Sequence, residues 1–207
     1  ILDAVVDGEE VDDRGAVLEL HHVVLAGFII WAELLTMVQK LEEHPELREA
    51  LAEEVAARVP GALSLDALDS LALGNRFVRE VKRVTAVVPG VFGMAKRDIE
   101  VSGYRIPKGF MLMWGIVEHH GRHGAFTDPD RFDPERFAVG RAEHERHPCA
   151  FAPQGAGPAT GHRCPGESYA TQLMQVFLVL VLRDYRCTLP PQDHTPDRSK
   201  IPPEPRD

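Results

Sequence analysis

The chain has 207 residues, 44% hydrophobic and 27% charged, which describes an ordinary globular protein large enough for one substantial core. Its 23 lysines and arginines against 32 aspartates and glutamates leave a formal net charge of −9, which argues against nucleic acid and anionic membrane surfaces as principal partners. Cys149, Cys164 and Cys187 are odd in number and widely spaced, so they predict no disulfide framework and fit a reducing cytoplasm.

The chain begins with a short acidic lead, residues 1–15, and continues with a long apolar run over residues 16–41. The lead lacks the charged-then-apolar pattern of a signal peptide, so we expect a cytoplasmic protein. The apolar run, which ends before Pro45, predicts one long helix. Polar residues such as Glu19 and Gln39 interrupt it too often for a membrane span, so we expect a buried core helix, with no membrane partner evident.

The two histidines of this helix have a bland interpretation and a functional one. His21 and His22 are either polar residues on a solvated face or members of a proton relay. Glu33 is expected to be solvated.

The middle of the chain predicts further helices and a small sheet. Residues 46–58 and 64–73 have helical patterns, and Asn75 can cap the helix that follows. In that helix Glu80 and Arg83 share a face, an arrangement that is usually an exposed ion pair worth well under about 1 kcal/mol. Strand-like segments then follow at residues 98–101 and 104–106, with an apolar stretch at 111–117.

Two polar segments lie between the sheet and the last motif. His119, His120 and His123 cluster in the sequence, but no cysteine or carboxylate completes a recognisable zinc set, so a metal site there is the weaker interpretation. Residues 141–147 are polar and are expected to be solvated. The proline-rich tail from Pro190 is expected to be irregular.

The most informative stretch is residues 151–167, which read FAPQGAGPATGHRCPGE. Its glycines and prolines predict a tight loop, and Pro165 and Glu167 suit the start of a helix over residues 168–182. This order presents Cys164 at a helix N-terminus, where unpaired N–H groups and the helix dipole favour a thiolate. A thiolate can ligate a metal or attack an electrophile, whereas the alternative is a buried, unreactive thiol.

Residues of this loop resemble the haem-binding loop of the cytochrome P450 superfamily: Phe151, Gly155, Gly157, His162, Cys164 and Gly166. Two further superfamily motifs precede them in the expected order, Glu80-x-x-Arg83 and the PERF segment at residues 134–137. The resemblance implies a mainly α fold with a small β-sheet, here the C-terminal half of a single P450 domain over residues 1–207. It also implies haem b (iron protoporphyrin IX), with Cys164 as the thiolate ligand of the iron.

The resemblance further implies three groups of site residues. Arg136 would join the Glu80–Arg83 pair in a buried charged network that supports the haem site. The residues expected to bind the cofactor are Cys164, His162, Arg163, Phe151, Gly155, Gly157 and Gly166. The residues expected on the substrate side are Leu25, Ala26, Ile29, Val88, Pro89, Val91 and Phe92, although plain strand core is an equal interpretation for the last four.

The sequence departs from the family pattern at several positions. Oxygen-activating members carry an acid and a threonine where this chain has Ile29 and Ile30, and these alkyl side chains cannot donate a proton. Peroxygenase members carry an Arg-Pro pair, and the matching positions are Leu25 and Ala26. An arginine that binds a haem propionate in many relatives is replaced by Gly93. The Cys164 loop itself is most similar to the bacterial fatty-acid peroxygenase branch.

By this resemblance we expect a haem-thiolate oxidoreductase that inserts one oxygen atom into an apolar, fatty-acid-like small molecule. The oxidant would be either dioxygen, with electrons from a redox partner, or hydrogen peroxide. An isomerase or dehydratase of an oxidised lipid, a truncated non-catalytic haem-binding fragment and a haem-free thiol enzyme remain as alternatives. No residue is assigned as a catalytic acid or base.

Overall fold

The computed structural model describes residues 5–6, 9–10, 12–122, 124–158, 160–161, 163–197, 199–202 and 204–206. His123 and His162 lie outside these residues. The helices are α1 (Asp13–Phe28), α2 (Trp31–Glu43), α3 (Pro45–Arg58), α4 (Leu65–Asp69), α5 (Ala72–Thr85), α6 (Ile116–His120), α7 (Glu167–Arg183) and the 3₁₀ turns η1 (Pro134–Phe137) and η2 (Glu143–Glu145). The strands are β1 (Val5–Val6), β2 (Glu9–Glu10), β3 (Gly90–Met94), β4 (Ile99–Val101), β5 (Tyr104–Ile106), β6 (Met111–Gly115), β7 (Pro196–Asp197) and β8 (Glu204–Pro205).

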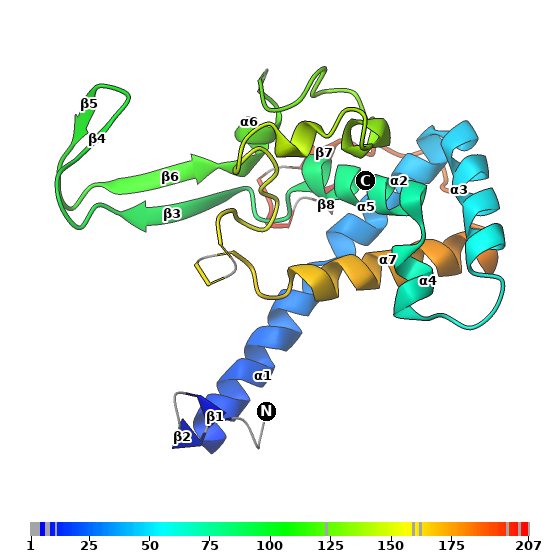
Figure 1. Cartoon of the computed structure of the whole chain (residues 1–207), viewed down its shortest axis with the longest axis horizontal. Helices are drawn as coiled ribbons and strands as arrows, with labels where there is room; N and C mark the ends of the chain where they lie inside the picture. Colours follow the sequence, from blue (N-terminus) through cyan, green and yellow to red (C-terminus); the bar gives the residue numbers. More distant parts are fainter. Residues whose placement is uncertain are drawn as a thin grey trace.

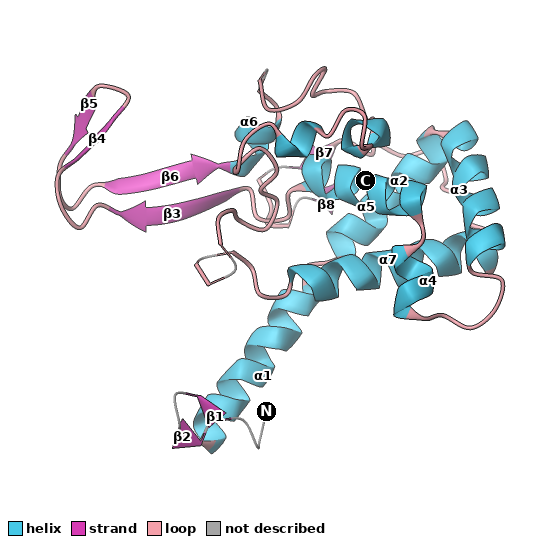
Figure 2. Cartoon of the chain, in the orientation of Figure 1, coloured by secondary structure: helices cyan, strands magenta, loops and turns pink. Residues whose placement is uncertain are grey.

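The mainly helical fold with small sheets that the sequence predicts is confirmed. Figure 1 shows three parts: a helical body, the α1 helix that projects from it, and the β3–β6 hairpin that extends from another side with β4 and β5 at its tip. Colouring by structure type shows that the strands lie mainly in this hairpin, away from the helical body (Figure 2). The Cys164 loop runs between the hairpin and the start of α7 (Figure 1).

The expected single long helix is divided at Ile29 and Ile30. There the N–H groups of Ile30 and Ala32 donate to carbonyls three residues earlier, of Gly27 and Ile29, each at 3.4 Å. This is a tighter turn than the α-helix, and two adjacent β-branched residues with stiff side chains disfavour the regular helix. Ile29 and Ile30, where the helix breaks, also line the cavity described below.

The expectation of burial is wrong for α1 and right for α2. Val17 and Phe28 on α1 are 65% and 68% exposed, whereas Met37 and Leu41 on α2 are buried in the core. The stretch Asp13–Glu43 is long and apolar enough to cross a membrane, a property that core helices of soluble proteins share, and 17% of its most apolar window is buried. Glu33, expected to be solvated, is instead buried.

Four helices build the core. Met37 of α2, Leu51 of α3, Phe77 of α5 and two residues of α7, Met174 and Leu178, pack in one buried cluster. Burying each such side chain stabilises the fold by about 1.5–3 kcal/mol. The predicted helices at 46–58 and 168–182 correspond to α3 and α7.

The helix expected over residues 64–73 is two helices, because the chain turns at Ser70 and Leu71 between α4 and α5. Asn75 does not cap α5; it lies inside the helix. The cap is Glu54 of α3, whose two carboxylate oxygens accept the N–H groups of Leu73 and Gly74, each at 2.8 Å. A carboxylate at a helix N-terminus satisfies unpaired donors and complements the helix dipole, a tertiary contact that local sequence does not reveal.

The sheet region follows the predicted strands closely. β3 and β6 pair antiparallel from Gly90 opposite Gly115 to Met94 opposite Met111. β4 and β5 form a hairpin whose turn contains Ser102 and Gly103 at positive φ. The stretch predicted over 111–117 ends as a strand at Gly115 and continues as α6. The tail, expected to be irregular, contains the short antiparallel pair β7–β8.

Candidate functional site around Cys164

A cavity of about 660 Å³ has Cys164 in its wall. It is lined by Ala26, Gly27, Ile29 and Ile30 at the α1–α2 junction, by Val87, Val88 and Val91 before and in β3, and by Gln154, Gly155 and Gly166 of the Cys164 loop. Segments that are far apart in the sequence therefore meet here. Most of these side chains are apolar, so the cavity suits a largely hydrophobic ligand.

The loop holds Cys164 by its backbone. The Cys164 N–H donates to the Gln154 carbonyl at 2.9 Å, which closes the loop on itself. Gly155 and Gly157 have φ of +87° and +91°, values that glycine adopts without steric cost. Helix α7 begins at Glu167, so Pro165 precedes the helix instead of opening its first turn. Cys164, a free and half-buried thiol, lies just before this helix N-terminus.

A buried lysine reaches the same loop from α5. The Lys82 Nζ donates to the Gln154 Oε1 at 2.7 Å and to the Thr171 Oγ1 at 2.7 Å. The Gln154 Nε2 lies 3.8 Å from the Cys164 Sγ. Burial lowers the pKa of Lys82, and the negative charge of Glu33 is the largest opposing influence. Burial likewise raises the pKa of Glu33, which the Lys82 cation partly offsets.

Glu80, Arg83 and Arg136 lie together in the interior. The Arg83 Nε and Nη2 donate to the two Glu80 carboxylate oxygens at 2.7 and 2.9 Å, a bidentate pair. The Arg136 Nε donates to the Glu80 Oε1 at 3.1 Å, and all three side chains are buried. Spacing alone favours an exposed ion pair between Glu80 and Arg83. The pair is instead buried, because η1 packs on α5 and covers it.

Sequence reasoning missed Glu143, which completes this network. The segment 141–147 was expected to be solvated, yet the Glu143 carboxylate is buried and accepts hydrogen bonds from Arg136 at 3.1 Å and from the Thr127 N–H at 2.8 Å. Although burial would raise it, hydrogen bonds from Arg141 and Thr127 hold the pKa of Glu143 at about 2. Arg141 is a local partner of Glu143, but the burial of its carboxylate depends on Thr127 and Arg136, which the pattern of residues 141–147 does not reveal.

His120 links this network to the Cys164 loop. Its Nε2 lies 3.0 Å from the Ala152 N–H, which must donate, so Nε2 accepts and Nδ1 carries the proton toward the Arg83 carbonyl at 3.2 Å. Burial lowers the pKa of His120 to about 4. The zinc interpretation gains no support: among the described residues no group of three metal-ligating side chains is present, and His119 contacts the Cys149 carbonyl.

The structure brings some of the expected site residues to the cavity and leaves others away from it. Cys164, Gly155 and Gly166 line it, as do Ala26, Ile29, Val88 and Val91 on the expected substrate side. The remaining expected residues do not line it. Leu25, Phe92 and Gly157 are exposed, and Pro89 lines a different cavity. Phe151 packs on Phe137 and His120, and Arg163 pairs with Glu167. His162 lies outside the described residues. Both histidines on α1 are exposed, and His22 also lines the cavity.

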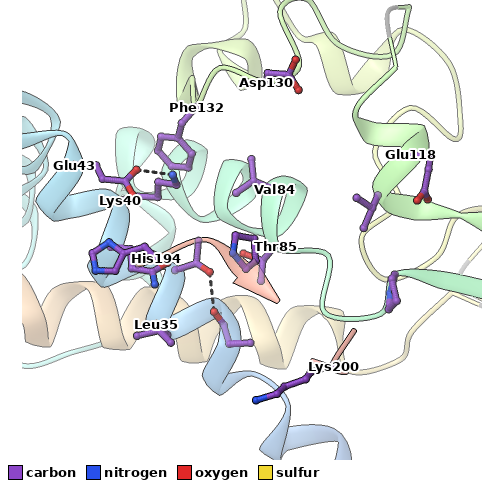
Figure 3. A pocket seen from close by; sticks show the side chains of 16 residues that line it. Leu35, Lys40, Glu43, Val84, Thr85, Glu118, Asp130, Phe132, His194 and Lys200 are labelled. Atoms are coloured by element: carbon purple, nitrogen blue, oxygen red, sulfur yellow. Dashed lines mark hydrogen bonds and ion pairs between the residues drawn. The ribbon is translucent and has the colours of Figure 1, made fainter. Parts of the chain in front are cut away.

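A second, smaller cavity of about 340 Å³ lies between α2, α5 and the segment around β7 (Figure 3). Figure 3 shows Lys40 and Glu43 paired on one side and Thr85 on the α5 side. The Thr85 Oγ1 and His194 Nε2 are buried without a hydrogen-bond partner among the described residues. Cys164 does not line this cavity, so it is separate from the thiol site.

Comparisons with known proteins agree with this geometry. The sequence model of the family described as Cytochrome P450 matches residues 32–203. The chain belongs to the cytochrome P450 family. It is 33% identical over 169 residues to putative cytochrome P450 136 of Mycobacterium tuberculosis, a match that covers 81% of this chain and 34% of that protein. It is 32% identical over 189 residues to abscisic acid 8'-hydroxylase 3 of Oryza sativa, covering 87% and 36%.

The P450 fold is shown by a solved structure as well. A retinoic acid-bound cyanobacterial CYP120A1 superposes with a TM-score of 0.88 at 23% identity, over 99% of this chain and 47% of that one. The chain therefore spans about a third of the length of these curated relatives and about half of the matched structure. The resemblance drawn from the three sequence motifs is confirmed.

The cavity fits the haem group that the P450 family implies. Its volume of about 660 Å³ lies within the range of roughly 300–1,000 Å³ typical of cofactor and small-molecule sites. Cys164, the donor atom that a haem-thiolate site needs, lies in its wall as a free thiol beside a helix N-terminus. The donor set and the apolar walls agree with an iron porphyrin.

Proposed function

We propose that this chain forms the C-terminal part of a single P450 domain, and that the domain binds haem b through the Cys164 thiolate. The observation that carries the proposal is the free thiol of Cys164 in the wall of an apolar cavity that the α1–α2 junction also lines. We propose that the domain inserts one oxygen atom into an apolar organic substrate, because a thiolate-ligated haem supplies electron density that favours cleavage of an O–O bond.

The residues around the thiol have separate roles in this proposal. Cys164 is the iron ligand, and the N-terminus of α7 favours its thiolate form through the positive end of the helix dipole. Gly166 borders the sulfur, since a Cβ at this position would lie in van der Waals contact, 3.7 Å from the Cys164 Sγ. Ala26, Ile29, Val88 and Val91 form apolar walls that exclude water and contact the substrate.

The buried ionic network has a supporting role. Glu80, Arg83, Arg136 and Glu143 connect α5, η1 and η2 through hydrogen bonds of 2.7–3.1 Å. His120 then joins the Arg83 carbonyl to the backbone of Ala152, twelve residues before Cys164. In this proposal these contacts position the loop that presents the thiol.

The test is the absorption spectrum of the reduced protein under carbon monoxide, recorded for wild type, Cys164→Ala and Cys149→Ala. A strongly red-shifted Soret band is expected in wild type and in the Cys149 control and not in Cys164→Ala. Haem that fails to bind, or the same band in all three proteins, would overturn thiolate ligation by Cys164.

A second candidate function, a peroxygenase that uses hydrogen peroxide, is favoured by one observation. Ile29 and Ile30, at the positions of the family's acid and threonine, line the cavity at the helix break and carry no proton donor. Because oxygen-activating members use that relay with dioxygen, a domain without it is better suited to hydrogen peroxide than to dioxygen and a redox partner. Turnover of an apolar substrate with hydrogen peroxide and no reductase would support the peroxygenase, whereas turnover only with dioxygen and a reductase would support the monooxygenase.

A further inference from the structure

Lys82 is a buried cation that none of the roles above explains. Only 2% of its surface is exposed, and fully buried lysines are rare unless they are paired. It lies in the helix of the Glu80–Arg83 pair, but its side chain reaches the Cys164 loop. The position of Lys82 therefore indicates a role at the Cys164 loop.

The hydrogen-bond directions around Lys82 are forced. An ammonium group only donates, so the atom of Gln154 that faces it at 2.7 Å must be the amide oxygen. The hydroxyl of Thr171 donates to the Glu167 carbonyl at 2.8 Å, so the lone pairs of its oxygen are free to accept from Lys82. With its oxygen held by Lys82, Gln154 presents its NH₂ group to the Cys164 sulfur, 3.8 Å away.

Charge adds to this geometry. Glu33 is buried as well, and its charge acts on Lys82 more strongly than that of any other acidic group. Lys82 places a buried cation on Gln154, which faces Cys164, so its positive charge attracts negative charge on the sulfur. An N–H donor and a nearby positive charge both hold negative charge on the sulfur, and so make that charge less available for donation to a bound iron.

We propose that Lys82, acting through Gln154, is a positioning residue that fixes an amide N–H on the Cys164 sulfur and thereby weakens electron donation from the thiolate to a bound haem iron. Donors near a ligating sulfur and the local charge tune the reduction potential of an iron centre. A less electron-rich sulfur stabilises the reduced iron, so Lys82 and Gln154 raise the potential. The proposal rests on the haem-thiolate function proposed above.

The test measures the midpoint potential of the ferric–ferrous couple in the haem-loaded full chain by spectroelectrochemical titration. Gln154→Leu removes the amide donor and leaves both buried charges in place. Lys82→Met combined with Glu33→Gln removes the buried cation and the buried carboxylate together, so that neither charge is left alone in the interior. Thr171→Val is the matched control, because it removes the other acceptor of Lys82 and leaves the Lys82–Gln154 contact.

We expect Gln154→Leu to change the ferric-to-ferrous ratio at a fixed potential at least tenfold toward ferric, a shift of about 59 mV for a one-electron couple. The midpoint potential of the double variant should shift in the same direction. In the triple variant the shift should be smaller than the sum of the shifts in Gln154→Leu and in the double variant, because Lys82 acts through Gln154. Thr171→Val should retain the wild-type potential. Glu33→Gln alone separates the effect of the carboxylate from that of Lys82.

The outcomes separate this inference from the proposed function. A red-shifted Soret band in wild type, together with equal potentials in wild type and Gln154→Leu, would overturn the inference alone. Fully additive shifts would also overturn it, since they would mean that the two residues act independently. If wild type lacks the band, the proposed function fails and the inference fails with it. If the double variant does not fold, the potential of Gln154→Leu compared with that of wild type still tests the inference.

Discussion

The neutral state of buried His120 makes the stability of this protein dependent on pH in a defined window. Burial lowers the pKa of His120 from its ordinary 6.5 to about 4. Between these values the unfolded chain binds a proton that the folded chain does not, so the free energy of unfolding falls as the pH falls from about 6.5 to about 4. The full loss is about 3 kcal/mol, at 1.36 kcal/mol for each pH unit between the two pKa values.

The perturbation that isolates this contribution is His120→Asn. The side-chain amide of asparagine can still donate to the Arg83 carbonyl but has no group that titrates in this range. It does not reach the Ala152 N–H, so we expect the variant to be less stable at pH 7 by about 1–3 kcal/mol, the cost of an unsatisfied buried donor.

The assay is urea unfolding at pH 7 and pH 5. For wild type, the part of the stability loss that comes from His120 should be about 2 kcal/mol between these two pH values. The loss in His120→Asn should be smaller by that amount, while His21→Asn, at an exposed histidine of α1, should follow wild type. An equal loss in wild type and His120→Asn would refute the reasoning, since it would mean that His120 is protonated in the folded protein or titrates there normally.

Three further substitutions test the scaffold by the free energy of unfolding in urea. Arg136→Lys should destabilise the protein by at least about 3 kcal/mol, because a lysine cannot match the planar donors that bind Glu80 and Glu143; a loss below 1 kcal/mol would contradict the network. Glu54→Ala should cost about 1–2 kcal/mol by uncapping α5, and the exposed Glu53→Ala on the same helix should cost nothing measurable. Met174→Ala should cost about 2–5 kcal/mol by leaving a core cavity, and a neutral result would mean that the core relaxes to fill it.

Sequence patterns were sufficient for the motifs whose meaning depends on local order. The glycines, prolines and cysteine of residues 151–167 predict a tight loop before a helix, and α7 follows that loop at Glu167, although Pro165 lies outside its first turn. The strands predicted at 98–101 and 104–106 are confirmed as β4 and β5, and the structure adds that they pair across a turn at Ser102 and Gly103. Family membership follows from three such local motifs in order, and the comparisons confirm it.

Other features depend on which residues meet across the fold. Glu143 is a polar residue in a polar segment, and only the packing of η2 against η1 buries its carboxylate beside Arg136. Lys82 is one more basic residue in its helix by sequence, yet the tertiary structure places its ammonium on the Gln154 amide, which faces Cys164. Burial and pairing are sums over neighbours from distant parts of the chain, and the charge state of a side chain follows from those neighbours.

The difference between what local sequence determines and what tertiary contacts determine is clearest at the long helix. Its apolar composition predicts a helix over residues 16–41, but composition is the same for an exposed and a buried apolar face. Only the positions of α3, α5 and α7 decide that α2 enters the core while α1 leaves Val17 and Phe28 exposed. Local order along the chain determines the elements and the motif that names the family, whereas contacts between distant segments determine what is buried, what is charged and which groups reach the thiol.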